Sequence, residues 1–154
     1  MSKDVFTMLN SLSLSATFPH RTPLERMCLS FLLTRTAMQL CSDCRYEQWK
    51  KRGISEPLTY MVPTAAENYA VYLPGKSLTV TLSADAFGLV VTIAVFVHLV
   101  VIDERAEEVY RYGELRKYAL QHPEKDLIHR ILDIGVFNEA SETPLTRSIN
   151  NNDN

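Results

Sequence analysis

The cysteines are the first residues to consider for chemistry, because two of them form a CxxC motif at Cys41 and Cys44. A structural zinc site usually has four ligands, and no second pair follows at a compatible spacing. A redox CxxC normally opens a helix, where the dipole lowers the thiol pKa, whereas this motif falls at the end of a predicted helix. With Cys28 the count is odd, and no secretory signal peptide is visible. We therefore interpret the cysteines as reduced thiols and expect a cytoplasmic protein.

Two short stretches match pieces of catalytic motifs. His122-Pro123-Glu124 has the H-x-E of zinc deaminases, but those enzymes carry a Pro-Cys-x-x-Cys after it, and here the CxxC lies upstream. Gly75-Lys76-Ser77 matches the end of a phosphate-binding loop, but position 70 is Ala70 where that loop needs glycine. We interpret the first stretch as a helix start, with His122 near the N-cap and Glu124 in the first turn. The second is interpreted as a hairpin turn.

Asp85 and His98 are polar residues in a long apolar segment. They are thirteen residues apart, which is about 20 Å along an ideal helix, so they cannot act as a pair. Asp85 favours the positive end of a helix dipole, and His98 is more typical of a core or boundary histidine than of a catalyst. We therefore expect no catalytic residues, no cofactor and no metal.

A basic and aromatic cluster lies between residues 45 and 52. Its positive charges and aromatic rings would suit phosphate contacts and base stacking, although a solvated basic face is the simpler interpretation in a chain of net charge −2. Together with the acid at the helix start, the cluster forms the candidate interaction surface: Arg45, Trp49, Lys50, Lys51, Arg52 and Asp85.

These residues must be positioned by elements organised around the segment 78–102. Leu78 to Leu82 alternates apolar and hydroxyl residues, as a half-buried strand does. Ser83 is a good N-cap for the apolar run that follows, and the length of that run favours a buried helix. Nine of the fourteen residues from Leu89 to Ile102 are β-branched, which favours a strand instead. A membrane span is the third interpretation, but the segment is barely long enough and lacks basic or tryptophan flanks.

The remaining pattern predicts helices on either side of short strands. A capping box at Thr22 with Pro23 at the first helical position starts a helix that runs to about Cys41. Its predicted apolar face is Met27, Cys28, Phe31, Leu32, Ala37, Met38 and Cys41. Strands are expected at 58–62, 69–73 and 78–82, a helix capped by Asp103, and another from Pro123 to near Gly135.

This order of elements predicts an α+β fold. We expect a small antiparallel sheet of three to four strands, a buried central helix and flanking helices. Residues 1–137 are expected to form one domain, and the polar segment 138–154 is expected to be disordered.

Several stretches together resemble the ArdB/KlcA antirestriction family. The most specific is the segment from Leu82 to Thr92, with His98-Leu99 following at the family's spacing. Further matches are Tyr60-Met61-Val62-Pro63 and a C-terminal set: Tyr112, Leu115, Tyr118-Ala119, His122-Pro123-Glu124, Ile131 and Asp133. The family usually carries a glycine pair and a Trp-aromatic strand ahead of the Tyr-Met segment. Residues 43–56 hold Trp49 but no glycine pair, so the sequence leaves a strand there open.

The resemblance implies a protein that protects incoming plasmid or mobile-element DNA from host type I restriction-modification enzymes. Eighteen acidic residues against sixteen basic ones provide no duplex-like field, so DNA mimicry is not expected. We instead expect protein-directed or indirect interference with the host restriction-modification system, with no strong DNA binding and no membrane association. One alternative is a small nucleic-acid-binding module that uses the segment 45–52. Another is a small enzyme that uses His98 or His122.

Overall fold

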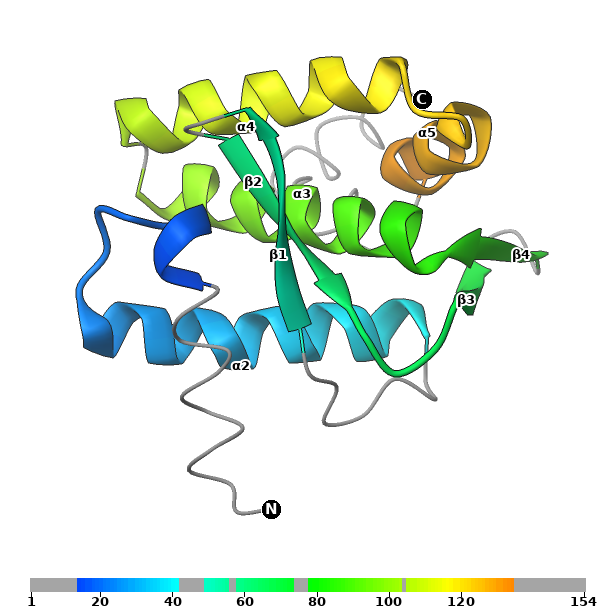
Figure 1. Cartoon of the computed structure of the whole chain (residues 1–154), viewed down its shortest axis with the longest axis horizontal. Helices are drawn as coiled ribbons and strands as arrows, with labels where there is room; N and C mark the ends of the chain where they lie inside the picture. The colour runs from blue at the N-terminus through cyan, green and yellow to red at the C-terminus, as the bar shows by residue number, and fades with distance from the viewer. Residues whose placement is uncertain (1–13, 42–48, 56–57, 74–77, 104, 135–154) are drawn as a thin grey trace, which may run out of the picture.

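The helix α3 (Ala84–Ile102) is the element against which the others pack. The computed structural model describes residues 14–41, 49–55, 58–73, 78–103 and 105–134. In Figure 1, α3 lies between α2 (Pro23–Leu40) and α4 (Ala106–Leu120), and the hairpin of β1 (Trp49–Ser55) and β2 (Leu58–Pro63) crosses in front. The remaining elements are β3 (Asn68–Leu73), β4 (Leu78–Ser83) and α5 (Lys125–Ile134).

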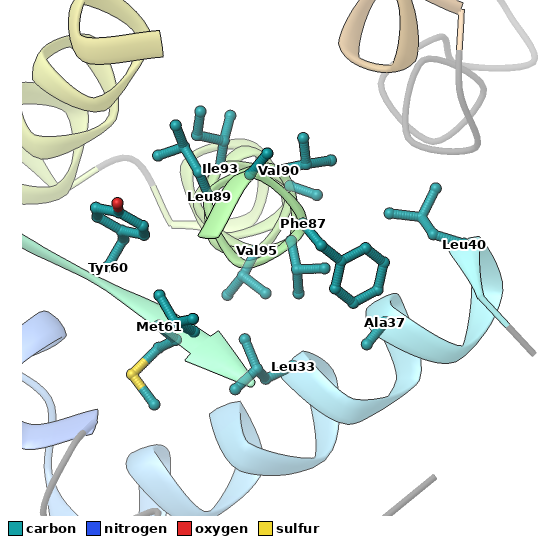
Figure 2. Close-up of a cluster of buried hydrophobic side chains, with 14 of the residues drawn as sticks. Leu33, Ala37, Leu40, Tyr60, Met61, Phe87, Leu89, Val90, Ile93 and Val95 are labelled. Atoms are coloured by element: carbon teal, nitrogen blue, oxygen red, sulfur yellow. The ribbon is translucent and has the colours of Figure 1, made fainter. Parts of the chain in front are cut away.

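The apolar run after Ser83 is a core helix, as predicted. Among the described residues, α3 is the helix that is long and apolar enough to cross a membrane, yet 67% of that window is buried inside the protein. Residues from α2 and β2 surround it, including Leu33, Ala37 and Met61 (Figure 2). The Ser83 hydroxyl accepts a hydrogen bond from the amide of Ala86, which confirms the predicted N-cap.

The capping box of α2 is also confirmed. The Thr22 hydroxyl accepts from the Glu25 amide, and the Glu25 carboxylate accepts from the Thr22 amide. The predicted apolar face of this helix was only partly right: Ala37 and Cys41 are buried, but the other predicted residues do not form the buried side. The buried residues are Leu29, Leu33, Thr36, Ala37 and Leu40, whereas Met27, Phe31 and Met38 are exposed. Apolar residues occur all round α2, so their periodicity does not mark one face, and packing against α3 selects the leucine-rich side.

The three predicted strands are present, and Trp49–Ser55 is the fourth strand, which the sequence had left open. Within the described residues the strands form two antiparallel pairs, β1 with β2 and β3 with β4, and not the single sheet expected. The physical reason lies at Met61 on β2. Its amide donates to the Thr92 hydroxyl at 3.0 Å, and its carbonyl accepts from the same hydroxyl at 3.4 Å. A side chain of α3 thus occupies the backbone groups that a further strand would pair with.

Two predicted helix starts were displaced. Asp103 ends α3 as its C-cap, and α4 begins after Arg105, whose side chain forms no capping hydrogen bond. The Arg105 guanidinium instead pairs with the Asp103 carboxylate at 2.8 Å. The last helix begins at Lys125 and not at Pro123, because a turn precedes it: the Lys125 amide donates to the His122 carbonyl at 3.0 Å. The predicted domain end and the polar tail lie outside the described residues and stay predictions.

Candidate functional site

The Asp85 carboxylate, in the first turn of α3, contacts polar side chains from β1, β2 and the turn before α5. The Tyr60 hydroxyl on β2 donates to its Oδ1 at 2.6 Å, and His122 Nε2 contacts its Oδ2 at 2.7 Å. The Arg52 guanidinium on β1 completes the set, 2.9 Å from Oδ1. The sequence interpreted Asp85 as a helix-dipole residue and placed it in the candidate interaction surface. The structure adds these three partners, all of which lie far from it in the chain.

A backbone hydrogen bond selects the tautomer of a neutral His122 ring. Its Nδ1 accepts the amide N–H of Glu124 at 3.0 Å, so a neutral ring carries its proton on Nε2 and donates it to Asp85. His122 is 6% exposed, and its ring meets that of Tyr118 edge-on. Because both ring nitrogens are engaged, any proton transfer to a bound molecule would first have to break one of these contacts.

Glu124 links the turn before α5 to the end of β4. Its carboxylate accepts from the Ser83 amide at 2.9 Å and from the Ser83 hydroxyl at 2.5 Å. The next amide, that of Ala84, donates to the carbonyl of Glu67 at 2.7 Å. The start of α3 is therefore held from two directions, by the β2–β3 connection and by the turn before α5.

Burial and charge act in opposite directions on the groups of this cluster. Burial tends to raise the pKa of Asp85, but the hydrogen bonds from Tyr60 and His122 and the charge of Arg52 outweigh it, so the pKa is lowered. Burial raises the pKa of Tyr60, and the Asp85 carboxylate beside its hydroxyl raises it further. The geometry therefore holds an ionised Asp85 against a neutral Tyr60.

A cavity of about 590 Å³ opens beside this cluster and is lined by most of the predicted interaction surface. Lys50, Lys51 and Arg52 line it from β1, and Ser83, Ala84 and Asp85 line it from the start of α3. Val62 to Thr64, with Ala66 and Glu67, complete the lining. Within this lining, the Asp85 carboxylate pairs with the Arg52 guanidinium.

The other predicted site residues lie elsewhere. Trp49 is 3% exposed, so its ring belongs to the core and is not presented for stacking on a base. Arg45 and Cys44 lie outside the described residues, while Cys28 is exposed and Cys41 is buried. His98 lies near the far end of α3, where burial, and then the charge of Arg35, lowers its pKa.

Comparison with known proteins identifies the family. A family model described as "Antirestriction protein" matches residues 42–133, more than half of the chain. The chain belongs to the antirestriction protein family. A curated family member, the antirestriction protein KlcA of Escherichia coli, is 30% identical over 99 residues, which cover 62% of this chain and 70% of that protein.

A solved structure of the family supports the fold as well. It shares 28% sequence identity and a TM-score of 0.59, covering 70% of this chain and 79% of that chain. It is described as showing that KlcA and ArdB have a novel fold, and antirestriction activity against type I DNA restriction systems in vivo but not in vitro. The family resemblance and the α+β architecture predicted from the sequence are thus confirmed.

The stretches that carried the family resemblance meet at the Asp85 cluster. Tyr60 comes from the Tyr-Met segment, Ser83 and Asp85 from the central segment, and His122 and Glu124 from the C-terminal set. Sequence reasoning missed this convergence because each stretch also had a local explanation as a strand end or a helix cap. The one available signal was that polar residues recurred in every stretch of the resemblance.

Proposed function

We propose that this protein protects incoming plasmid or mobile-element DNA from host type I restriction-modification enzymes, and that it does so without imitating DNA. The observation that carries the proposal is the solved relative, described as active against type I systems in vivo but not in vitro. Activity that needs the cell suggests that the protein acts through another cellular protein or indirectly. A protein that inhibits by occupying the DNA groove of a nuclease would also inhibit the purified nuclease.

The charge distribution supports the same mechanism. A DNA mimic needs a dense array of unpaired carboxylates that imitates the phosphate spacing of a duplex. Here the chain has 18 acidic and 16 basic residues, and many described acids are neutralised by arginine or lysine. The neutralised acids are Glu25, Asp85, Asp103, Glu107, Glu108 and Glu114.

The proposed contact surface is the rim of the cavity, formed by Lys50, Lys51, Arg52 and Asp85. Within the described part of the chain, no ion pair joins Lys50 or Lys51 to an acid, so both ammonium groups are available to a partner. Arg52 has a 56% exposed side chain although it pairs with Asp85. These cations suit an acidic protein surface, such as one on a subunit of the restriction system.

Phage plating tests the proposed function. Unmodified phage is plated on a host with a type I system and on a matched host without one, each with and without this gene. We expect the gene to raise the plating efficiency on the restricting host toward that on the other host. Plating on the host without a type I system should not change, because that host has no restriction to relieve. Equal plating on the restricting host with and without the gene would reject the proposal.

A double charge reversal, Lys50→Glu with Lys51→Glu, tests the proposed surface. We expect loss of protection in the plating assay with an unchanged melting temperature, since both residues are exposed. Lys117→Glu with Arg130→Glu is the matched control: it makes the same change in net charge on α4 and α5. If the control variant loses protection equally, net charge and not the cavity rim is responsible.

The alternative is a nucleic-acid-binding module, and the specific observation that favours it is the run of three basic residues along β1. It predicts DNA affinity that falls steeply with salt. If Lys50 and Lys51 each neutralise a phosphate, the double reversal lowers the slope of log K against log salt by about 2. Tight, salt-dependent DNA binding by the purified protein, lost in that variant, would favour this alternative over a protein partner.

A further inference from the structure

The hairpin of β1 and β2 has one edge to which a further strand can be added. On the β2 side, the amide and carbonyl of Met61 are bonded to the Thr92 hydroxyl of α3, so a strand cannot pair there. On the β1 side, the ladder runs to β2 alone within the described residues. In an antiparallel pair, every second residue directs its N–H and C=O away from the neighbouring strand. The outer edge of β1, from Lys50 to Gly53, therefore presents backbone groups that have no strand partner in the described part of the chain.

The surroundings of this edge are open. Every residue from Lys50 to Gly53 is exposed, and a Cβ atom built on Gly53 would meet no atom within 4 Å. The regular ladder extends from Trp49 to Gly53, and its register shifts before Ser55. Because such an irregularity bends a strand, an added strand would pair with about five residues, a length of about 17 Å.

The charges along β1 decide which kind of strand fits. Lys50 and Arg52 lie on the face of the hairpin that carries Tyr60, and Lys51 lies on the other face. Arg52 is already paired with Asp85, 2.9 Å away, whereas no acid in the described part of the chain pairs with either lysine. Adjacent residues of a strand point to opposite faces. A strand of complementary charge would therefore carry two adjacent acids, one opposite each lysine.

A second copy of this chain does not suit the same edge. Two β1 strands paired edge to edge would place the cations of one copy beside those of the other, and like charges opposite one another destabilise a sheet. Lysine on an edge strand is a common protection against such pairing. The charges of β1 thus disfavour self-association and favour an acidic partner.

We propose that β1 binds an extended acidic segment of a partner protein as an added strand, with two adjacent carboxylates paired with Lys50 and Lys51. Main-chain hydrogen bonds then supply affinity, and the two charge pairs supply specificity. The cavity of about 590 Å³ is lined by the same stretch of β1 and can receive side chains of the added strand. That the segment belongs to the restriction system rests on the proposed function, whereas the strand addition itself does not.

Fluorescence anisotropy with a labelled peptide tests the strand addition. The full chain is titrated into the probe Thr-Val-Thr-Glu-Glu-Thr-Val-Thr at about 150 mM salt. We expect saturable binding with a dissociation constant below about 1 mM. One control peptide has Lys-Lys in place of Glu-Glu. The other, Pro-Pro-Pro-Glu-Glu-Pro-Pro-Pro, keeps both charges but lacks most of the N–H donors that a ladder needs. Each control should bind about tenfold or more weakly.

Charge reversal and hydrogen exchange locate the bound peptide. Lys50→Glu with Lys51→Glu should raise the dissociation constant of the probe about tenfold or more. Lys117→Glu with Arg130→Glu, which makes the same change in net charge, should alter it by less than about twofold. In the parent protein, amides of Trp49–Ser55 that face outward should exchange about tenfold or more slowly when the probe is saturating, because they then donate to the added strand.

Three results would overturn the proposal. If the probe does not bind at about 1 mM, the lysines only protect the edge from aggregation. If the proline peptide binds equally, or if exchange in β1 is unchanged, the peptide is held by charge without an added strand. If a DNA duplex binds more tightly than the probe and displaces it, the edge belongs to a nucleic-acid site.

The plating assay separates this proposal from the proposed function. Probe binding with slowed exchange in β1, together with a gene that gives no protection, would refute the antirestriction function and leave the strand addition standing. Protection by the gene without probe binding would refute the strand addition alone.

Discussion

The Asp85 carboxylate accepts hydrogen bonds from Tyr60 and His122 and pairs with Arg52. Its side chain is 21% exposed, so water could only partly replace a partner that was removed. Buried polar networks of this kind stabilise a fold while complete and destabilise it when one partner is missing. The residue therefore joins β1, β2 and the turn before α5 to the start of α3.

Replacing this carboxylate by the amide of the same shape, Asp85→Asn, should destabilise the protein by about 1 to 3 kcal/mol. The amide has no negative charge to pair with Arg52. Its NH₂ group cannot accept a hydrogen bond, so either Tyr60 or His122 loses its acceptor. Urea unfolding measures the change. Asp126→Asn is the matched control, since Asp126 is an exposed first-turn acid of α5. It should cost less than about 1 kcal/mol, the size of a helix-dipole effect. If both variants lost the same free energy of unfolding, Asp85 would act only through the helix dipole.

The contribution of Asp85 to stability should also depend on pH. Because its pKa is lower in the folded protein than in the unfolded chain, the unfolded chain binds more protons in the acid range, and stability rises with pH there. The contribution is present above about pH 4 and is lost as pH falls through the lowered native pKa. The difference in free energy of unfolding between the parent and Asp85→Asn should therefore shrink between about pH 5 and pH 3. A constant difference over that range would contradict the pKa shift.

At the scale of elements, the contact between α3 and β2 depends on one glycine. A Cβ atom built on Gly88 would lie 2.2 Å from the Met61 carbonyl oxygen and 2.8 Å from the Val62 Cα. Both obstacles are backbone atoms, so the helix itself would have to move away from the strand. Glycine in a helix interior costs about 1 kcal/mol relative to alanine, and here the close approach of helix and strand requires it.

Gly88→Ala should therefore destabilise the protein by about 1 to 3 kcal/mol or more, despite the better helix propensity of alanine. Gly113→Ala on α4 is the matched control, because a Cβ at Gly113 meets no atom within 4 Å. That variant should be stabilised by about 0.4 to 1 kcal/mol. Thermal and urea unfolding of both variants measure the difference. A neutral or stabilising Gly88→Ala would show that α3 and β2 are less closely packed than the structure has them.

Local signals in the sequence predicted the elements better than their contacts. Ser83 and Thr22 marked helix starts because capping depends on neighbouring residues only. The outward side of α2, the separation of the strands into two pairs and the partners of Asp85 depend on which distant segments meet. Thr92 shows the difficulty: one hydroxyl in an apolar run gives no sign that it satisfies a strand backbone 31 residues earlier. The candidate surface was found from its charge, but the burial of Trp49 was not.

At the scale of the whole molecule, the charge balance decides how the protein should behave toward a purified restriction enzyme. Inhibitors that compete for a DNA groove act through charge and release counterions, so their inhibition weakens steeply as salt rises. A chain of net charge −2 whose described acids are largely paired has no such field to lose.

We therefore expect weak inhibition of a purified type I enzyme, even at large molar excess, with no marked change between about 50 mM and about 200 mM salt. DNA cleavage by the enzyme, measured at both salt concentrations, tests this expectation. The control is a strongly acidic DNA-mimic protein, which should inhibit cleavage at the lower salt concentration and inhibit less at the higher one. Stoichiometric inhibition by this protein that collapses at the higher salt would mean that its surface presents a duplex-like field after all, and the protein-directed mechanism would have to be abandoned.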